Sequence, residues 1–186
     1  MKRIFDIIVS VIFFLVVLLP MAIIALSIML TSKGPILHWS DRVGRNSLVF
    51  KMPKFRTMKL ETPDLPTHLM KNPNQYLSSI GPFLRKYSLD ELPQLALIFS
   101  GDMSFVGPRP ALFNQDDLIT LRKEKNIDSL KPGLTGWAQV NGRDDISINE
   151  KVTLDFEYLT NQSFILDLKI FWMTILKVIK SNNISH

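Results

Sequence analysis

The chain has 186 residues, of which 46% are hydrophobic, 10% aromatic and 21% charged, a balance that excludes a disordered chain and two large domains. The formal net charge of +5 suits nucleic acid, phosphate groups or an anionic membrane surface, and charge alone does not choose among them. Because the chain has no cysteine and only three scattered histidines, thiolate chemistry is excluded and any metal would be held by oxygen.

A long uncharged run lies near the start of the sequence. From Ile7 to Leu30 there are 24 residues without a charge, and as a helix of about 36 Å they could cross a hydrocarbon core of roughly 30 Å. A cleaved signal peptide fits poorly, because its apolar stretch is about 7–15 residues and ends at a small-residue cleavage site. The run therefore predicts a membrane segment.

Pro20 divides this run, because proline lacks the backbone donor and clashes with the preceding turn of a helix. The two arms, Ile7–Leu19 and Met21–Leu30, are each too short to span a bilayer alone. A re-entrant hairpin with both ends on the cytoplasmic face and a single kinked spanning helix fit these observations equally well. Basic residues flank both ends and give no orientation by the positive-inside rule. They are Lys2, Arg3, Lys33, Arg42 and Arg45.

The remaining chain is predicted to be α+β, mainly helical with a small β-hairpin. Extended segments 36–40 and 48–52 flank a turn at 41–47, and the proline-containing stretch 60–76 is expected to be a loop. Segments 114–125 and 147–160 are predicted polar surface helices. The strongest helix, Phe164–Lys180, has a basic polar side and an aromatic-rich apolar side, so it suits either an amphipathic helix in the membrane interface or a helix covering the core.

A further helix is predicted from the apolar spacing of residues 89–99. Its start is ambiguous, because Ser88 and Glu91 have the form of a capping box while Pro93 is better tolerated as the first helical residue. In either case Asp90 and Glu91 lie at a helix N-terminus. Such an end attracts phosphate, and a carboxylate there can attack phosphorus or bind Mg²⁺, although acidic residues are also favoured in first turns for purely structural reasons.

Two stiff loops rich in glycine and proline follow this helix. Residues 101–110 fix the backbone around Arg109, and a rigid loop that presents one cation is what an anion site requires. Residues 132–143 contribute Trp137, whose aromatic plane is suited to stacking on a base. The polar side chains of this second loop are Gln139, Asn141 and Arg143.

Four blocks of this sequence resemble the signature of the bacterial sugar transferases, the small monotopic phosphoglycosyl transferases. The blocks are Lys54–Met58, Ser88–Leu95, Gly101–Pro110 and Pro132–Arg143. They occur in this order, and the resemblance covers essentially the whole chain. It implies that residues 1–32 form a re-entrant membrane segment and residues 33–186 a cytoplasmic catalytic domain.

The activity implied by this resemblance is transfer of a sugar 1-phosphate from a UDP-sugar to a polyprenol phosphate such as undecaprenyl phosphate, with release of UMP. It would take place at the cytoplasmic face of the bacterial inner membrane, as the first membrane step of glycan assembly. The implied partners are these two substrates and membrane lipids, without nucleic acid. The identity of the sugar, the glycan pathway and the existence of a homodimer stay open.

The resemblance also implies roles for individual residues. Asp90 would be the nucleophile that forms a covalent phosphosugar intermediate, Glu91 its Mg²⁺-binding neighbour, and Asp167 a supporting polar residue. The residues expected to bind substrate phosphates are Lys54, Arg85 and Arg109. Those expected near the nucleotide-sugar are Trp137, Gln139, Asn141 and Arg143.

Two other functions are compatible with parts of the sequence. A membrane-tethered module that binds anionic lipid or nucleic acid would explain the positive charge, but adjacent carboxylates in a cationic pocket repel nucleic acid phosphates. A UDP-sugar hydrolase would use the same donor and would not depend on a polyprenol phosphate acceptor.

Overall fold

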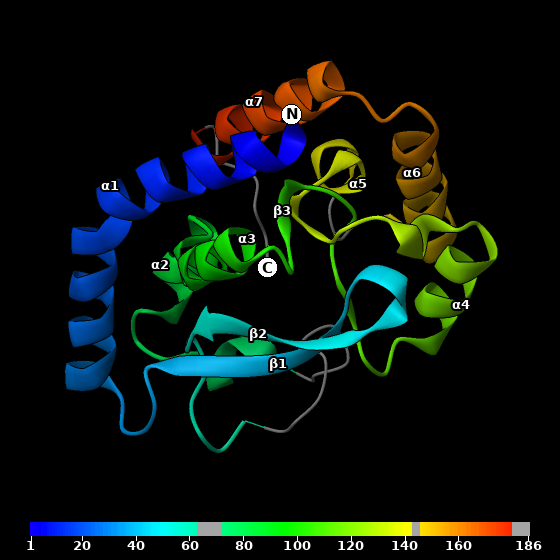
Figure 1. The fold of residues 1–186 in the computed structure, drawn as a ribbon. Helices are drawn as coiled ribbons and strands as arrows, with labels where there is room; N and C mark the ends of the chain where they lie inside the picture. Colours follow the sequence, from blue (N-terminus) through cyan, green and yellow to red (C-terminus); the bar gives the residue numbers. More distant parts are fainter. Residues whose placement is uncertain (63–71, 143–145, 180–186) are drawn as a thin grey trace.

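The computed structural model describes residues 1–62, 72–142 and 146–179. They form a mainly helical α+β structure in which a long N-terminal helix lies along one side of a domain that contains two small sheets (Figure 1). The predicted α+β class, mainly helical with a small β-hairpin and an N-terminal apolar helix, is therefore confirmed. The division at residues 1–32 and 33–186 stays a prediction.

Helix α1, Lys2–Thr31, contains the whole apolar run and passes through Pro20 without a break in the helix. Figure 1 shows a bend between an upper arm beside α7 (Phe164–Ile179) and a lower arm that descends toward β1 (Leu37–Val43). Within the described residues it is the one helix long and apolar enough to cross a bilayer. Most of its apolar side chains are exposed. The buried residues are Asp6, Ser10, Ile24 and Ile28.

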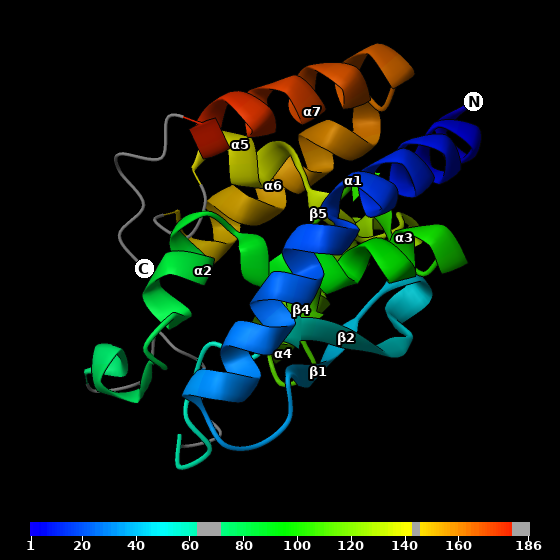
Figure 2. The same ribbon diagram turned by 90° about the vertical axis from the view of Figure 1, so that its left-hand side faces the viewer.

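The N-terminal end of α1 is tied to the domain by charged side chains. Lys2 Nζ lies 2.7 Å from Asp167 Oδ2 and also donates to the Tyr158 hydroxyl at 3.0 Å. Arg3 donates to two backbone carbonyl oxygens in the last turn of α3 (Leu95–Ser100), at 2.6 and 2.8 Å. Figure 2 shows α1 crossing this face of the domain, with α7 along one side and α3 behind it.

The C-terminal end of α1 is tied to the same domain. Arg56, directly after β2 (Val49–Phe55), donates to the carbonyl oxygens of Ser32 and Lys33 at 3.0 and 2.6 Å. A buried apolar cluster closes the same region and consists of Ile24, Ile28, Phe55 and Leu84. Both ends of the apolar helix therefore contact one domain.

The predicted β-hairpin is confirmed, with longer strands than expected. β1 and β2 pair antiparallel from Leu37 opposite Phe55 to Val43 opposite Val49. The turn contracts to the 3-10 segment η1 (Arg45–Ser47), because Asn46 adopts a left-handed conformation with φ 55°. The turn predicted at 41–47 was too long, since its first three residues belong to β1. A two-residue strand, β4 (Ala111–Leu112), adds to β1 and was not predicted.

A second, parallel sheet joins the two glycine-rich loops. β3 (Ser104–Val106) pairs with β5 (Gly133–Thr135), and both strands lie inside segments that were expected to be loops only. The backbones approach so closely that a Cβ on Gly133 or Gly136 would collide with the backbone of Gly107. This sheet places the Arg109 loop beside the segment that contains Trp137.

The expected helices are present, with corrected bounds. The helix predicted at 147–160 is α6 (Ile148–Thr160), which begins with a capping box formed by Ser147 and Glu150. The other short helices are η3 (Pro73–Tyr76), α2 (Gly81–Lys86), η4 (Leu89–Gln94), α4 (Asp116–Glu124), η5 (Ile127–Ser129) and α5 (Trp137–Asn141).

The sequence of α7 suited either a helix in the membrane interface or a helix covering the core, and its structure has features of both. Ile170 is buried against the domain, and Phe171 packs edge-on against Phe5 of α1. Asp167, near the start of the helix, is also buried and pairs with Lys2. The other side of the helix exposes large apolar side chains. They include Ile165, Trp172 and Leu176, at 80%, 62% and 51% exposure.

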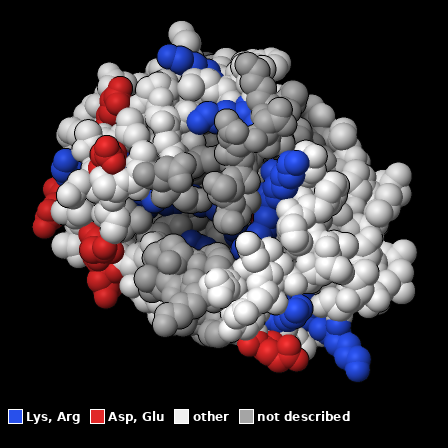
Figure 3. Space-filling view, turned by 180° about the vertical axis from the view of Figure 1, so that it is seen from behind, with Lys and Arg blue, Asp and Glu red and all other residues white. Residues whose placement is uncertain are grey.

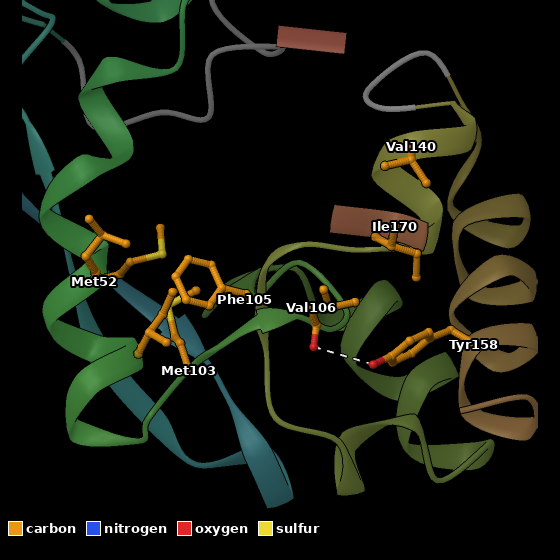
Figure 4. Close-up of a cluster of buried hydrophobic side chains, with 9 residues drawn as sticks. Met52, Met103, Phe105, Val106, Val140, Tyr158 and Ile170 are labelled. Atoms are coloured by element: carbon orange, nitrogen blue, oxygen red, sulfur yellow. Dashed lines mark hydrogen bonds between the residues drawn. The ribbon is translucent and has the colours of Figure 1, made fainter. Parts of the chain in front are cut away.

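The main core lies where the hairpin, α3, β3 and the C-terminal helices meet. In Figure 4, Met52, Met103 and Phe105 point toward one another, while Tyr158 extends from α6 toward the backbone of Val106. The Tyr158 hydroxyl donates to Asp167 Oδ1 at 2.6 Å. The core is therefore connected through Tyr158 to the charged residues that hold α1.

Substitution of Asp6 tests how strongly helix α1 is bound to the rest of the domain. Its buried carboxylate accepts hydrogen bonds from Ser104 Oγ at 2.8 Å and from the Phe105 N–H at 3.3 Å. Asp6→Ala leaves both donors without this acceptor, which should lower the free energy of unfolding by about 1–3 kcal/mol. We expect the Tm of the purified protein in detergent to fall by roughly 3–10 °C.

Ser10→Ala is the matched control for this measurement. Ser10 is also buried in α1, but its hydroxyl donates to the Ile7 carbonyl oxygen of the same helix. Its removal should therefore change the Tm little. Equal Tm values for the two variants would contradict an anchoring role of Asp6.

Candidate active site

Asp90 and Glu91 lie in the first turn of η4, which leads directly into α3. The sequence left two alternatives for the helix start, and the helix begins at Leu89, directly after Ser88 but without the capping box, so Asp90 and Glu91 do lie at a helix N-terminus. Ser88 forms no side-chain cap and adopts a left-handed conformation with φ 54°, which turns the chain sharply before Asp90. Pro93 lies inside the 3-10 helix, and because proline interrupts the α-helical bonding pattern, α3 begins only at Leu95.

Glu91 is held between two cations from other parts of the chain. Its Oε1 lies 2.9 Å from Lys54 Nζ and 2.7 Å from Arg109 Nη2, and its side chain is 15% exposed. Burial by itself raises the pKa of Glu91, but the charges and hydrogen bonds of Arg109 and Lys54 outweigh it and lower the pKa well below the usual range. Glu91 is therefore ionised and fixed in position.

Asp90 has a different environment from its neighbour. It is 8% exposed, and within the described residues its contacts with the surrounding cations are electrostatic, without a hydrogen bond to its carboxylate. Burial raises the pKa of Asp90, and the charge of Lys54 offsets this effect only in part. The site thus combines one firmly paired carboxylate with one desolvated carboxylate whose oxygens stay available.

Arg85 approaches the pair from α2. Its Nε donates to Thr57 Oγ1 at 3.0 Å, which fixes the side chain beside the end of the hairpin. Burial lowers the pKa of Arg85, and the negative charge of Asp90 opposes that change. The three cations predicted to bind phosphate, Lys54, Arg85 and Arg109, are therefore all brought to the two carboxylates.

Arg109 is supported from behind by a buried ion pair that the sequence did not reveal. Arg122 of α4 pairs with Asp155 of α6 at 2.5 Å, and its Nη1 donates to the Arg109 carbonyl oxygen at 2.8 Å. Burial raises the pKa of Asp155, while the Arg122 charge and hydrogen bond lower it. The segments 114–125 and 147–160 were predicted to be surface helices, and no local pattern distinguishes Arg122 from a solvated arginine.

Arg42 is a further cation near this cluster. The sequence placed it only among the residues flanking the membrane run. Its Nη1 donates to the Pro110 carbonyl oxygen at 3.2 Å. Burial and, next, the charge of Arg109 lower the pKa of Arg42 to about 10, while Glu91 opposes that change. The alternation of side chains along the hairpin was the signal that could have found it.

The predicted nucleotide-sugar residues form a separate group. Lys169 Nζ lies 5.4 Å from the centre of the Trp137 ring, and Asn141 Nδ2 donates to the Trp137 carbonyl oxygen. Within the described part of the chain, Trp137 Nε1 and both ends of the Gln139 amide are buried without a hydrogen-bond partner. The β3–β5 sheet brings this group alongside the Arg109 loop. Arg143 lies outside the described residues.

Asp167 is placed with the α1 anchor. It contacts Lys2 and Tyr158, and these contacts explain its burial at the start of α7. Burial and the hydrogen bond to Asp167 raise the pKa of Tyr158. These contacts tie the start of α7 to α1, and the role of Asp167 as a supporting polar residue of the active site stays a prediction.

The assembled site carries an excess of positive charge. Among the described residues of the site there are four cations, Arg42, Lys54, Arg85 and Arg109, and two carboxylates, Asp90 and Glu91. Lys and Arg side chains also gather in a hollow on the rear face of the molecule (Figure 3). A site of this composition is suited to a ligand that carries about two negative charges.

Comparison with known proteins decides the family. The model of the bacterial sugar transferases matches residues 1–181. The chain belongs to this family. The matched region includes both carboxylates, their cations and the apolar helix.

Three relatives show how this sugar transferase compares with longer proteins. The uncharacterised sugar transferase EpsL of Bacillus subtilis is 40% identical and is covered over 91% of its length by the whole chain. The undecaprenyl-phosphate glucose phosphotransferase of Komagataeibacter xylinus is 37% identical over 98% of this chain and 36% of its own. The UDP-glucose:undecaprenyl-phosphate glucose-1-phosphate transferase of Escherichia coli is 36% identical over 95% of this chain and 40% of its own. The chain therefore spans well under half of the latter two proteins.

Arg109→Lys tests whether this cation acts through its geometry. Lysine keeps the charge near Glu91 but loses the planar arrangement of donors that can hold a phosphate at two points. We expect transferase activity to fall at least about tenfold, equivalent to about 1.4 kcal/mol of transition-state stabilisation.

The matched control is Arg45→Lys in the neighbouring turn. Arg45 is exposed and donates to the Ser129 carbonyl oxygen, outside the cluster. The transferase activity of Arg45→Lys should stay near that of the wild type. Near-normal turnover in Arg109→Lys as well would indicate that Arg109 serves only the fold.

Proposed function

We propose that this sugar transferase moves a sugar 1-phosphate from a UDP-sugar to undecaprenyl phosphate and releases UMP. The observation that carries the proposal is the pair of unlike carboxylates, Asp90 and Glu91, buried among cations. The names of two relatives support the acceptor and the donor, since both include undecaprenyl phosphate and one includes UDP-glucose.

In the first step, an Asp90 carboxylate oxygen attacks the donor phosphorus that bears the sugar. The bond from that phosphorus to the bridging oxygen breaks, and UMP leaves with the electron pair. The sugar phosphate is then covalently bound to Asp90. The lack of a hydrogen bond to Asp90 from the described residues supports this role, because the attacking oxygen need not first lose a strong partner.

In the second step, an oxygen of undecaprenyl phosphate attacks the same phosphorus. The Asp90 carboxylate leaves with the electron pair of its bond to phosphorus, which restores the free enzyme. The product is the sugar joined to the lipid through a diphosphate. Lys54, Arg85 and Arg109 offset the repulsion between anionic reactants in both steps.

Mg²⁺ is the proposed cofactor, and the residues present fit it. Mg²⁺ is usually held by one or two carboxylates together with substrate phosphates, and Asp90 and Glu91 supply two adjacent carboxylates. Lys54 and Arg109 both contact Oε1 of Glu91, so the hydrogen bonds leave Oε2 outside this pairing. When bound, the metal ion would neutralise charge on the substrate phosphates.

The geometry of α1 supports a re-entrant arrangement at the cytoplasmic face of the inner membrane. A helix that crossed the bilayer would place its ends on opposite sides, but here Lys2 and Arg3 at one end and Ser32 and Lys33 at the other contact one domain. The exposed apolar surface between them is available to lipid. A site docked in this way lies at the level of a lipid phosphate.

This topology can be tested by labelling single cysteines, because the chain has none of its own. A cysteine inserted after Met1 and a Lys33→Cys variant should both react with a membrane-impermeant maleimide only from the cytoplasmic side. Leu19→Cys, which lies at the dividing proline and is 70% exposed, should react from neither side because lipid covers it. Labelling of either end from the outside would contradict the hairpin.

Asp90→Asn tests the nucleophile. The amide cannot form the acyl phosphate, so the variant should be inactive at any Mg²⁺ concentration. Wild-type protein given a UDP-sugar without acceptor should release UMP and gain the mass of a sugar phosphate, and Asp90→Asn should do neither. If the variant still gained this mass, the nucleophile would have to be another residue.

Glu91→Gln should fail in a different way. Losing one ligand weakens Mg²⁺ binding and charge stabilisation, so part of the activity should return as Mg²⁺ is raised. A titration of UMP release against Mg²⁺ measures this difference. An Mg²⁺ response identical to that of the wild type would exclude Glu91 as a ligand.

The pH dependence of the first step follows from the raised pKa of Asp90. Only the ionised carboxylate attacks, so the rate should fall as the pH drops, and it should begin to fall at a higher pH than for an ordinary aspartate. Lys54→Met removes a charge that favours ionised Asp90 and should move the midpoint to still higher pH. Rapid-quench measurement of UMP release checks both expectations, and an unmoved midpoint would contradict them.

A UDP-sugar hydrolase is the competing activity. It would release UMP and sugar phosphate into solution at the same rate with or without a lipid acceptor. Assays with UDP-glucose, UDP-galactose and UDP-N-acetylglucosamine, each with and without undecaprenyl phosphate, separate the two and identify the preferred sugar. Transfer requires that sustained UMP release depend on the lipid.

A further inference from the structure

The segment that carries Arg109 begins at β3. Arg109 lies shortly after Val106, the last residue of β3, and it is flanked by Pro108 and Pro110. Proline fixes φ at about −65°, so the backbone on both sides of Arg109 has little freedom to absorb a displacement. A shift of β3 is therefore passed on to Arg109, and whatever holds β3 also supports the contact of Arg109 with Glu91.

The two edges of β3 have different partners. On one edge, the Ser104 N–H donates at 2.9 Å to the chain that enters β5. On the other edge, the Phe105 N–H donates to Asp6 Oδ1 at 3.3 Å, and the Val106 carbonyl oxygen accepts from Lys2 Nζ at 2.9 Å. Asp6 Oδ2 also accepts from the Ser104 hydroxyl at 2.8 Å. Two side chains of α1 thus bond to β3 where a further strand of the sheet would lie.

Lys2 and Asp6 are suited to act together on β3. They are four residues apart in α1 and therefore lie on the same face of the helix. Lys2 Nζ also bonds to the Tyr158 hydroxyl at 3.0 Å and to Asp167 Oδ2 at 2.7 Å, so with Val106 it uses all three donors of an ammonium group. The Asp6 carboxylate is buried, with both of its oxygens bonded to β3. Both side chains are thus held in one orientation.

The later part of the Arg109 loop is bonded to other parts of the domain. The Pro108 carbonyl oxygen accepts from the Gly133 N–H at 2.9 Å, and the Arg109 carbonyl oxygen accepts from Arg122 Nη1 at 2.8 Å. These bonds hold the loop to β5 and α4. The bonds from α1 are their counterpart at the start of the loop.

We propose that the start of α1 positions the Arg109 loop, with Lys2 and Asp6 as the positioning residues. The membrane helix is in this way a part of the donor phosphate site as well as an attachment to lipid. When α1 is docked on the domain, β3 is held from both edges and Arg109 is kept at Glu91, where it meets a phosphate of the donor. By reciprocity, a ligand that binds Arg109 favours the docked position of α1. This proposal rests on the proposed function, since it takes Arg109 as a residue that binds the UDP-sugar.

Arg3 provides the matched control for this role. It lies beside Lys2 in the sequence and ties the same end of α1 to the domain. Its guanidinium, however, donates to the carbonyl oxygens of Ile98 and Phe99 at the end of α3. Substitution of either residue weakens the attachment of α1, but substitution of Lys2 also removes a bond to β3.

The test compares Lys2→Met, Asp6→Asn and Arg3→Met with the wild type in lipid nanodiscs. The Kd for UDP is measured by calorimetry, since UDP carries the phosphates but no transferable sugar. Hydrogen exchange is measured for the backbone amides of residues 104–112. Lys2→Met and Asp6→Asn should raise the Kd at least about fivefold, because a displaced Arg109 meets the phosphates less well, and should speed this exchange. Arg3→Met should match the wild type in both measurements.

A general role of α1 in stability predicts a different result. It would lower the Tm of Lys2→Met and Arg3→Met alike and leave the Kd for UDP unchanged in both variants. That outcome overturns the proposal, as does an equal rise in Kd in the two variants or unchanged exchange in Lys2→Met. If Lys2→Met does not fold, Asp6→Asn, which keeps the size of the side chain, decides by the same two measurements.

The outcomes also separate this proposal from the proposed function. If wild-type protein binds UDP but transfers sugar phosphate from no UDP-sugar, the function fails while the comparison of UDP affinities still decides the role of α1. If wild-type protein does not bind UDP, the proposed donor is wrong and the exchange of residues 104–112 decides. If the wild type transfers sugar phosphate and the Lys2 and Asp6 variants match Arg3→Met, the positioning role is overturned and the function stands.

Discussion

The site depends on one carboxylate oxygen, Oε1 of Glu91, which meets Lys54 and Arg109 together. These three residues come from the hairpin, from η4 and from the loop after β3, so the contact joins segments that are distant in the sequence. A buried carboxylate is costly unless it is paired, and the pairing therefore fixes the relative positions of these segments. Because Glu91 occupies the cations in this way, the adjacent Asp90 keeps its oxygens available. The same contact thus gives the two neighbouring acids different environments, with Glu91 paired to two cations and Asp90 buried without a hydrogen bond to its carboxylate among the described residues.

The burial pattern of the apolar helix α1 is the reverse of that of a helix in a soluble domain. Its polar residues Asp6 and Ser10 are buried, and most of its large apolar side chains face outward. This inversion is stable when the inner face meets polar partners such as Ser104 and the outer face meets lipid. The exposed apolar side of α7 continues this arrangement. The same surface that attaches the domain to lipid is therefore built on the residues that hold its core together.

The features that could be predicted are those encoded in neighbouring residues. The hairpin, the long C-terminal helix and the position of Asp90 and Glu91 follow from alternation, helical spacing and charge within short segments. The β3–β5 sheet could not be predicted, because its three-residue strands are too short to show a pattern and depend on glycine contacts between two loops. The positions of Arg42 and Arg122 at the site were not predicted for a similar reason, since only the packing of distant elements distinguishes them from ordinary surface arginines.

The anchor at the start of α1 has a consequence for how the protein is made. Lys2 is separated by 165 residues from Asp167, its ion-pair partner. During synthesis α1 leaves the ribosome before α7, and α7 carries the acid that pairs with Lys2. The ion pair between Lys2 and Asp167 can therefore form only after most of the domain has been synthesised. This contact is thus a late, long-range event in folding, and contacts of such large sequence separation form slowly.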